Sequence, residues 1–208
     1  MSVTLIEKKL VLGIELAGTL MTPEEFDAVE EYDDLYFYEL INGVLVVTPL
    51  PLEAEADPNE ELGRLLRNYQ EDHPQGSALD KTLQERIVRT RTNRRRGDRV
   101  IWAGLGRVPN PRVDPPTIIV EFVSRARRDR RRDYVEKRRE YLELGVAEYW
   151  IIDRFRRSMT VVQNLPSGAV ERVVGENETY QSPLLPGFEL PLARLLGLAD
   201  QWQRSESQ

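Results

Sequence analysis

The pattern of apolar and polar positions is most informative in residues 117–153. Residues 117–123 form a largely β-branched apolar run that contains one carboxylate, Glu121, and is bounded by two prolines and a serine. A short apolar run with turn residues at both ends predicts a strand that is buried on both faces. Glu121 shares one face of this strand with Ile119 and Val123. An isolated ionised carboxylate is strongly destabilising in such a place, so we expect Glu121 to have a partner.

A helix with a period of 3.6 residues follows this strand and offers two candidate partners. Its apolar arc consists of Tyr134, Val135, Tyr141, Leu142 and Leu144. Lys137 and Arg138 both fall inside the arc, so periodicity does not choose between them. The alternative is that either side chain buries only its stem and directs its charged head into solvent. Because residues 147–153 predict another strand, the strand–helix–strand unit indicates a parallel or mixed sheet and an α/β fold class.

Capping, hairpin and periodicity signals predict the remaining elements. A threonine cap followed by proline and two glutamates starts a helix at Thr22, which we expect to end near Tyr32. Asn42-Gly43 lies between two strand patterns, residues 35–41 and 44–48, and predicts a hairpin. The other expected elements are a loop at 49–58, a helix at 59–69, a strand at 79–90, an arginine-rich turn, a short strand at 98–102, a hairpin at 158–163 and 170–174, and an apolar segment at 190–198. With no repeat or linker visible, we expect a single domain over residues 1–208, with a core at about 20–198 and frayed termini.

Composition restricts the chemistry that this chain can perform. Its 208 residues contain no cysteine and a single histidine, His73. Disulfides, thiolate zinc sites, cysteine nucleophiles and multi-histidine sites are therefore excluded, and catalysis has to use carboxylates, lysine, arginine or tyrosine. His73 follows a predicted helix, where a surface or capping role is the usual one. No apolar run approaches the ~20 residues of a membrane span and no signal peptide is visible, so we expect a cytoplasmic protein.

Charge is distributed unevenly along the chain. The formal net charge is −6, but residues 86–99 and 125–139 are rich in arginine. Two such blocks in a net-acidic chain predict a local basic surface for a polyanion. The alternative, to which we give equal weight, is that these arginines are solvated or pair with neighbouring acids.

Several short motifs, each present once, follow one another in a characteristic order over residues 20–198. The motifs are Thr22-Pro23-Glu24-Glu25-Phe26, residues 38–43, residues 121–124, residues 133–137, Tyr141, Gly145-Val146, residues 148–153 and residues 185–188. Each motif is weak alone, but the ordered set resembles the Uma-type restriction endonuclease family, a branch of the PD-(D/E)XK nuclease superfamily. The resemblance implies a restriction-endonuclease-like core, in which a central mixed sheet is flanked by helices, with a magnesium-dependent phosphodiesterase site.

The resemblance also assigns roles to individual residues. Asp98 matches the family's first catalytic aspartate, Glu121 its paired acid, and Glu39 the acid contributed by the early hairpin region. Val123 stands where the lysine of the superfamily usually lies. The family displaces this lysine to the following helix, where Lys137 takes the role. The implied metal-binding residues are Asp98, Glu121, Glu39 and Phe122.

The residue types suit this chemistry, although two positions depart from the family pattern. Carboxylate oxygens are the ligands that magnesium prefers, and a nearby lysine can position a water or stabilise developing negative charge. Gly97 replaces the proline that commonly precedes the aspartate, and the loop at 49–59 lacks the histidine that the family often has. The second departure predicts altered metal affinity or reduced activity.

We therefore expect a metal-dependent DNA endonuclease that uses magnesium, or manganese in its place. We expect a homodimer with no membrane association and no organic cofactor. The alternatives are a catalytically silent nucleic-acid-binding domain with the same fold, and a protein-interaction domain. The arginines expected to contact DNA flank the proposed site: Arg94, Arg95, Arg96, Arg127, Arg128, Arg131 and Arg132.

Overall fold

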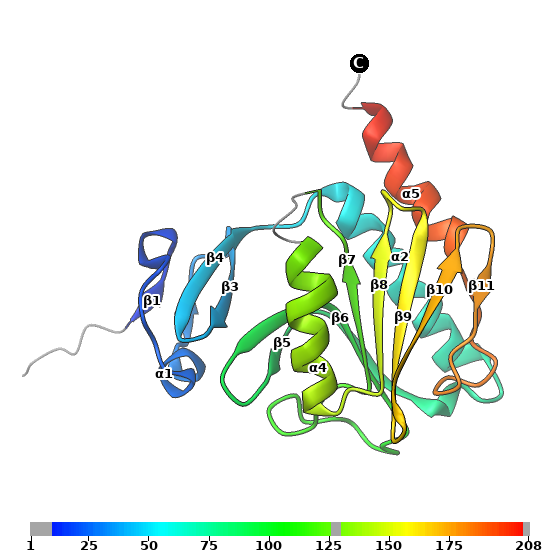
Figure 1. Ribbon diagram of the computed structural model, residues 1–208, viewed down its shortest axis with the longest axis horizontal. Coiled ribbons are helices and arrows are strands. Elements are labelled where there is room, and N and C mark those ends of the chain that lie inside the picture. The colour runs from blue at the N-terminus through cyan, green and yellow to red at the C-terminus, as the bar shows by residue number, and fades with distance from the viewer. Residues whose placement is uncertain (1–9, 126–129, 206–208) are drawn as a thin grey trace, which may run out of the picture. The chain divides into compact units, whose positions relative to one another are not determined.

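The computed structural model describes residues 10–125 and 130–205, and the side chains of that part up to residue 202. Its contacts divide the chain into two compact units (Figure 1). Unit 1 comprises Met1–Leu50 and Thr92–Arg95, and unit 2 comprises Pro51–Arg91 and Arg96–Gln208. The organisation of the whole chain as a single domain stays a prediction, and each unit is described separately below.

Unit 1 is built around the hairpin that Asn42-Gly43 predicts. Strands β3 (Tyr36–Ile41) and β4 (Val44–Pro49) pair antiparallel, and Asn42 and Gly43 adopt the positive φ angles of 50° and 77° that a tight hairpin turn requires. The other elements of this unit are β1 (Val11–Leu12), η1 (Ile14–Leu16), α1 (Pro23–Ala28) and β2 (Glu31–Tyr32). The capping box at the start of α1 is confirmed, because the side chains of Thr22 and Glu25 each accept a hydrogen bond from the backbone N–H of the other residue.

The helix α1 is shorter than the sequence predicts. It ends at Ala28, and the next residues turn away to form β2, which pairs in parallel with β1. The expected end near Tyr32 was therefore wrong. Residues 31 and 32 pair with β1 instead of extending the helix. A small core of Leu12, Tyr38 and Leu45 holds the unit together.

Unit 2 contains the mixed sheet and its covering helices. Strands β10, β9, β8, β7 and β6 are neighbours in that order, and β5 pairs with β6. Their bounds are β5 Leu79–Arg89, β6 Arg94–Ala103, β7 Ile118–Phe122, β8 Glu148–Asp153, β9 Ser158–Leu165 and β10 Gly168–Gly175. Strands β7 and β8 run parallel, while the pairs β6–β7, β8–β9 and β9–β10 are antiparallel. The strand–helix–strand unit and the mixed sheet predicted from the sequence are confirmed.

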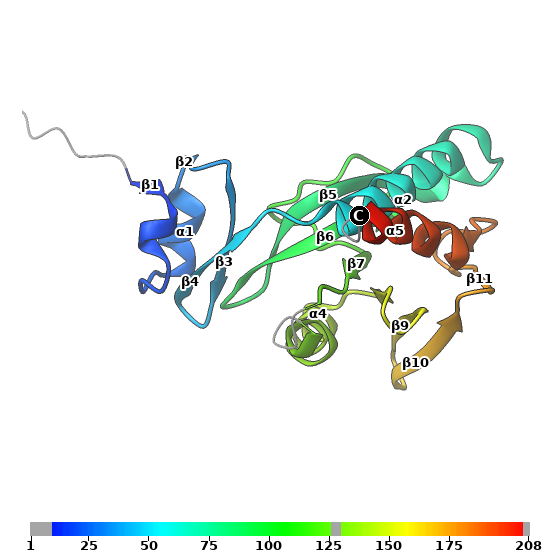
Figure 2. The same cartoon turned by 90° about the horizontal axis from the view of Figure 1, so that it is seen from above.

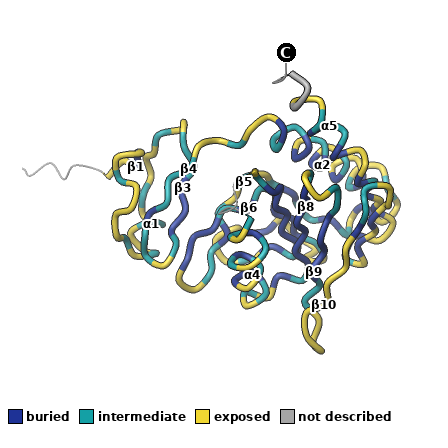
Figure 3. Tube along the Cα trace, turned by 45° about the horizontal axis from the view of Figure 1, so that its top comes forward, coloured by how far each residue is buried: buried dark blue, intermediate teal, exposed yellow. Residues whose placement is uncertain are grey.

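Strand β7 is buried on both faces because helices cover the sheet on both sides. Its residues Ile118 and Val120 pack into a cluster with α2 (Glu53–Asp72) and α5 (Leu192–Ser205), whereas Ile119 packs on the other face with Tyr141 of α4 (Arg138–Leu144). Figure 2 shows α2 and α5 on one side of the sheet and α4 on the other. The strands β8 and β9 form the deeply buried centre of this unit in Figure 3.

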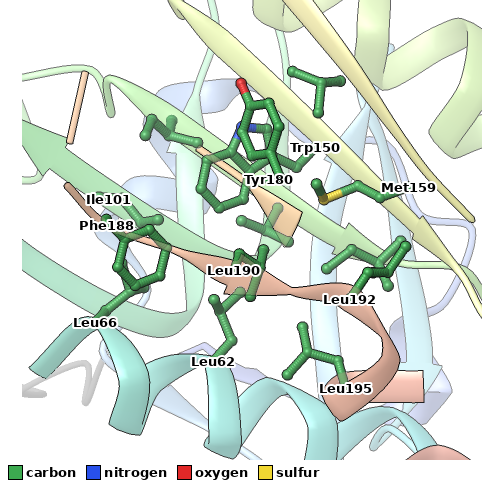
Figure 4. Packing of buried hydrophobic residues seen from close by; sticks show 14 of the residues in the cluster. Leu62, Leu66, Ile101, Trp150, Met159, Tyr180, Phe188, Leu190, Leu192 and Leu195 are labelled. Carbon is green, nitrogen blue, oxygen red and sulfur yellow. The ribbon is translucent and has the colours of Figure 1, made fainter. Parts of the chain in front are cut away.

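The larger cluster of this core combines leucines from the helices with side chains of the sheet. Leu62 and Leu66 of α2 and Leu195 of α5 face Trp150 and Met159 of the sheet (Figure 4). All five residues are fully buried, so this interface contributes hydrophobic stabilisation to the packing of α2 and α5 on the sheet. The remaining elements of unit 2 are η2 (Gly76–Ala78), η3 (Arg132–Lys137), β11 (Thr179–Tyr180) and β12 (Leu190–Pro191).

Two elements of this region begin earlier than their sequence patterns predict. Helix α2 starts at Glu53 and runs through Pro58, where we expected a loop. Ala54 and Pro58 are both buried, so packing against the core outweighs the hydrogen bond that the proline cannot donate. Strand β6 starts at Arg94, so the expected arginine-rich turn is also wrong at residues 94–96.

None of the helices in the described residues combines the length and the apolar character that a membrane span requires.

Candidate functional site

The antiparallel pair β6–β7 brings Asp98 to the end of the strand that carries Glu121. Arg99 is the register partner of Val120, which places the preceding residue, Asp98, beside Glu121. The Oδ2 atom of Asp98 accepts a hydrogen bond of 2.6 Å from the backbone N–H of Phe122. The side-chain amide of Asn59, in α2, donates to the carbonyl of Asp98 at 2.9 Å. The aspartate is thus fixed to β7 through its side chain and to α2 through its backbone.

The packing around residue 97 explains why a glycine is accommodated before Asp98. A Cβ atom built on Gly97 would lie 3.1 Å from Cγ2 of Ile119 and 3.3 Å from Cγ1 of Val100. These contacts are tighter than most side chains accept, so β6 and β7 approach each other closely at this point. The departure from the family's proline therefore coincides with a place where the strands leave little room.

Glu121 is buried and has the partner that its position demands. Its side chain is 2% exposed, and Oε2 accepts a hydrogen bond of 2.6 Å from Nζ of Lys137. The hydroxyl of Tyr141 donates to Oε1 at 3.3 Å. Arg138, the alternative by periodicity, instead pairs with Glu171 at 2.6 Å on the surface. Lys137 is therefore the residue that faces the buried carboxylate, and its ammonium group is not directed into solvent.

The lysine is held by three oxygen atoms from different elements. Besides Glu121, Nζ donates to the carbonyl of Arg96 at 2.6 Å and lies 3.8 Å from Oδ1 of Asp133. Lys137 and Asp133 belong to η3, a π-helical segment, and the carbonyl of Asp133 accepts a hydrogen bond of 3.0 Å from the hydroxyl of Tyr149. Because π-helical turns are rare and concentrate at functional positions, this local geometry singles out the start of the helix.

Burial and neighbouring charges perturb the acid–base chemistry of Glu121. Removal from water raises the pKa of its carboxyl group well above the usual value, and the charges of Asp98 and Asp133 raise it further. The ammonium group of Lys137 opposes this rise by stabilising the carboxylate. Glu121 and Asp133 are thus both buried beside the ammonium group of Lys137.

Glu85 is a member of this site that the sequence pattern did not reveal. It lies in β5, its φ angle of 50° is unusual for any residue other than glycine, and its carbonyl accepts a hydrogen bond of 2.9 Å from Arg96. Burial, followed by the charge of Asp98, raises the pKa of Glu85 to about 8. In the sequence this glutamate is simply one polar position of an alternating strand. Only the pairing of β5 with β6 shows that it faces the cluster.

The donor set suits a hard divalent cation. Asp98 raises the pKa of both Glu85 and Glu121, so these acids form a charge cluster that a bound cation would neutralise. Within residues 10–125 and 130–205, however, no three Asp, Glu or His side chains are already arranged as a metal-binding group. The metal ligands predicted from the sequence, including Phe122, therefore stay predictions.

The third predicted acid, Glu39, belongs to unit 1. It is buried in β3, opposite Val46 of β4. Asp98, Glu121 and Lys137 all belong to unit 2. The participation of Glu39 in the same site therefore stays a prediction.

The arginines expected to bind DNA fall into different environments. Arg94 and Arg95 are buried, and the Nη2 atom of Arg94 lies 2.7 Å from Oδ2 of Asp27. The expectation that residues 94–96 form an exposed turn was therefore wrong, although their contact with DNA was not tested by this. Arg131 is 78% exposed and lies 3.9 Å from Glu136, and Arg132 lies 3.5 Å from Asp133. The remaining two, Arg127 and Arg128, lie outside the described residues.

Comparison with known proteins places this geometry in context. The sequence matches the model of the Uma2 family, described as "Putative restriction endonuclease", over residues 23–193. The structure resembles the crystal structure of a protein from Anabaena variabilis ATCC 29413 that is described as a putative nuclease belonging to DUF820. The two are 15% identical and have a TM-score of 0.68, over 86% of this chain and 99% of that chain. No curated protein sequence matches this chain.

Proposed function

Since this chain belongs to the Uma2 family, as its motifs predicted, we propose that it is a metal-dependent endonuclease that hydrolyses phosphodiester bonds in DNA. The observation that carries the proposal is the cluster of Asp98, Glu121 and Lys137 on β6, β7 and η3. Each of the three is fixed by hydrogen bonds of 2.6 Å, and they are the residues to which the resemblance in sequence assigned the roles of the acids and the lysine.

In this proposal Glu121 and Asp98 supply negative charge at the end of β7, where a cation and a phosphate would meet. A bound magnesium ion would supply a water of lowered pKa and neutralise charge on the phosphate. The carboxylates of Asp98 and Glu121 would hold it, and Glu85 adds a third acid within their electrostatic reach. Manganese, which accepts the same oxygen ligands, would serve in its place.

Lys137 has two tasks in the same proposal. Its ammonium group opposes the rise in the pKa of Glu121 that burial causes, and so favours the carboxylate form that the site needs. It also places a compact positive charge beside the reacting phosphate, where it can orient a water or stabilise the oxygens as negative charge develops. The carbonyl of Arg96 fixes the ammonium from a second direction, so the charge is held without reorganisation.

A second candidate function is a silent nucleic-acid-binding domain that keeps the fold. The observation favouring it is that the protein itself satisfies the cluster: Lys137 bonds Glu121 directly, and the backbone of Phe122 bonds Asp98. Such a closed network would bind a metal only after rearrangement. The same experiment separates the two functions.

The test is cleavage of supercoiled, linear and single-stranded DNA by the full-length protein with magnesium, manganese or chelator. We expect nicking with either metal and none with chelator. The matched variants are Asp98→Asn, which removes a charge from the cluster, and Asp114→Asn, which removes a charge that pairs with Arg107 in a loop of the same unit. Nicking that survives in Asp98→Asn or in chelator would overturn the proposal, as would the absence of nicking in the wild-type protein.

A further inference from the structure

A cluster of arginines in unit 2 lies at the end of β8, next to the end of β7 where the candidate site is located. Strands β7 and β8 are parallel, with Glu121 opposite Ile151 and Phe122 opposite Ile152. The backbone N–H of Val123 donates to the carbonyl of Ile152 at 2.9 Å, so the strands are still paired where they end. The turn that joins β8 to β9 begins three residues after Ile151, the residue opposite Glu121. Measured along the strand, this is about 10 Å.

This turn is shaped by a single buried acid, Asp153. Its side chain is fully buried, and Oδ1 accepts hydrogen bonds from the backbone N–H groups of Phe155 at 2.9 Å and Arg156 at 3.1 Å. The same atom accepts from Nη2 of Arg130 at 3.1 Å, and Oδ2 accepts from the hydroxyl of Tyr134 at 3.2 Å. The carboxylate thus fixes the turn and pairs with arginine side chains.

Three arginines gather around aromatic rings on this turn. The guanidinium carbons of Arg130 and Arg154 lie 4.9 Å and 4.7 Å from the centre of the Phe155 ring, and that of Arg156 lies 5.0 Å from the centre of the Tyr134 ring. Such contacts hold a guanidinium in place without consuming its charge or its planar N–H groups. Phe155 is 36% exposed and the side chain of Arg156 is 61% exposed, so the cluster reaches the surface.

Among the described residues, the arginines of this cluster outnumber the carboxylates that pair with them. Arg130 and Arg156 share the one carboxylate of Asp153. Arg154 forms no ion pair with any carboxylate in the described part of the chain, and its Nε and Nη1 atoms, which are shielded from solvent, have no hydrogen-bond partner there. No carboxylate among the described residues offsets the charge of this guanidinium, and phosphate oxygens are groups that such a charge attracts.

We propose that the β8–β9 turn, with Arg154 and Arg156 and the neighbouring Arg130, binds backbone phosphates of the nucleic-acid strand whose cleavage is proposed above. The inference rests on that proposed function for the identity of the polyanion. Phe155 is a positioning residue: its ring holds Arg130 and Arg154 and makes no contact with the phosphates itself. The turn follows β8, the neighbour of the strand β7 that carries Glu121. Phosphate binding at this turn would therefore hold the nucleic acid beside Glu121.

The test measures DNA binding in chelator, where cleavage does not interfere. Fluorescence anisotropy of labelled duplex and single-stranded DNA is recorded with full-length protein at several salt concentrations between ~50 and ~200 mM. The variants are the double substitution Arg154→Gln with Arg156→Gln, and Phe155→Leu, which removes no charge. The matched control is Arg194→Gln, because this arginine pairs with Glu61 on the α2–α5 face. Circular dichroism and thermal melting confirm that each variant is folded.

We expect the double variant to bind about tenfold more weakly and to lose about 0.9 from the salt slope for each phosphate contact removed from duplex DNA. Phe155→Leu should weaken binding in the same direction, and Arg194→Gln should match the wild-type protein. If the double variant binds DNA as tightly as the wild-type protein, this inference is overturned and the proposed function is not. Unchanged binding by Phe155→Leu would overturn the positioning role. Absence of salt-dependent binding by the wild-type protein would overturn both proposals, whereas binding without any nicking would overturn only the proposed function.

Discussion

The Nζ atom of Lys137 lies 2.6 Å from Oε2 of Glu121, and both side chains are almost completely buried. The two residues come from η3 and β7, and the pair is completed by the carbonyl of Arg96 and the hydroxyl of Tyr141. A buried charge pair of this kind is expensive to form, because both ions lose their hydration. Its presence in the centre of a well-packed unit therefore favours a functional role over a purely structural one.

The first prediction tests whether Lys137 acts as a compact charge. Lys137→Arg should fold and bind DNA but lose ~100-fold or more of its nicking rate, because a planar guanidinium that is always protonated cannot replace an ammonium beside a water. The matched control is Arg138→Lys, whose side chain pairs with Glu171 on the surface and should nick DNA at the wild-type rate. Full activity of Lys137→Arg would show that the lysine is only structural.

The second prediction concerns the stability of the same pair. Lys137→Met leaves the carboxylate of Glu121 buried without its ammonium partner and should lower the free energy of unfolding by about 3–5 kcal/mol at neutral pH. The double variant Lys137→Met with Glu121→Gln removes both charges and should recover a large part of this loss. Urea unfolding followed by circular dichroism measures the difference. Equal losses in the single and the double variant would mean that the charge of Glu121 is not what destabilises the single variant.

The third prediction follows from the pKa of Glu85, which is raised to about 8 by burial and by Asp98. In the unfolded chain this carboxyl group loses its proton at a lower pH, so the folded state binds the additional proton over the interval between the two pKa values. Stability in the absence of metal should therefore fall as pH rises from about 4.5 to about 8. Glu85→Gln should reduce this slope, which thermal melting at a series of pH values in chelator will show. A slope identical to that of the wild-type protein would contradict the assignment of the raised pKa to Glu85.

The fourth prediction separates structural from DNA-binding arginines. Arg94 is buried and pairs with Asp27, so Arg94→Gln should lower the stability of the protein by about 1–3 kcal/mol through the loss of charged hydrogen bonds. The salt slope of DNA binding should stay at the wild-type value, unlike that of the Arg154 and Arg156 double variant. A slope that falls by about 0.9 in the Arg94→Gln protein would return this residue to the DNA-binding set.

Several local features of the chain were determined by its sequence. The capping box at Thr22 and the hairpin turn at Asn42-Gly43 form as predicted, because each is decided by backbone preferences within four or five residues. The buried strand β7 also forms as predicted, since its apolar run can be accommodated only inside a covered sheet. The need of Glu121 for a partner followed directly from its place in that strand.

The tertiary structure decided which side chains meet, because helical or strand periodicity specifies a face of an element but not what packs against that face. Lys137 and Arg138 are equivalent on the helical arc, and only the packing of η3 against β6 and β7 selects the lysine. Glu85 is one of many polar strand residues until the pairing of β5 with β6 brings it near Asp98. The arginines at 94–96 resemble an exposed basic turn until strand pairing and the carboxylate of Asp27 make them part of a sheet. In each case the deciding contact joins residues far apart in the chain, and no local pattern records it.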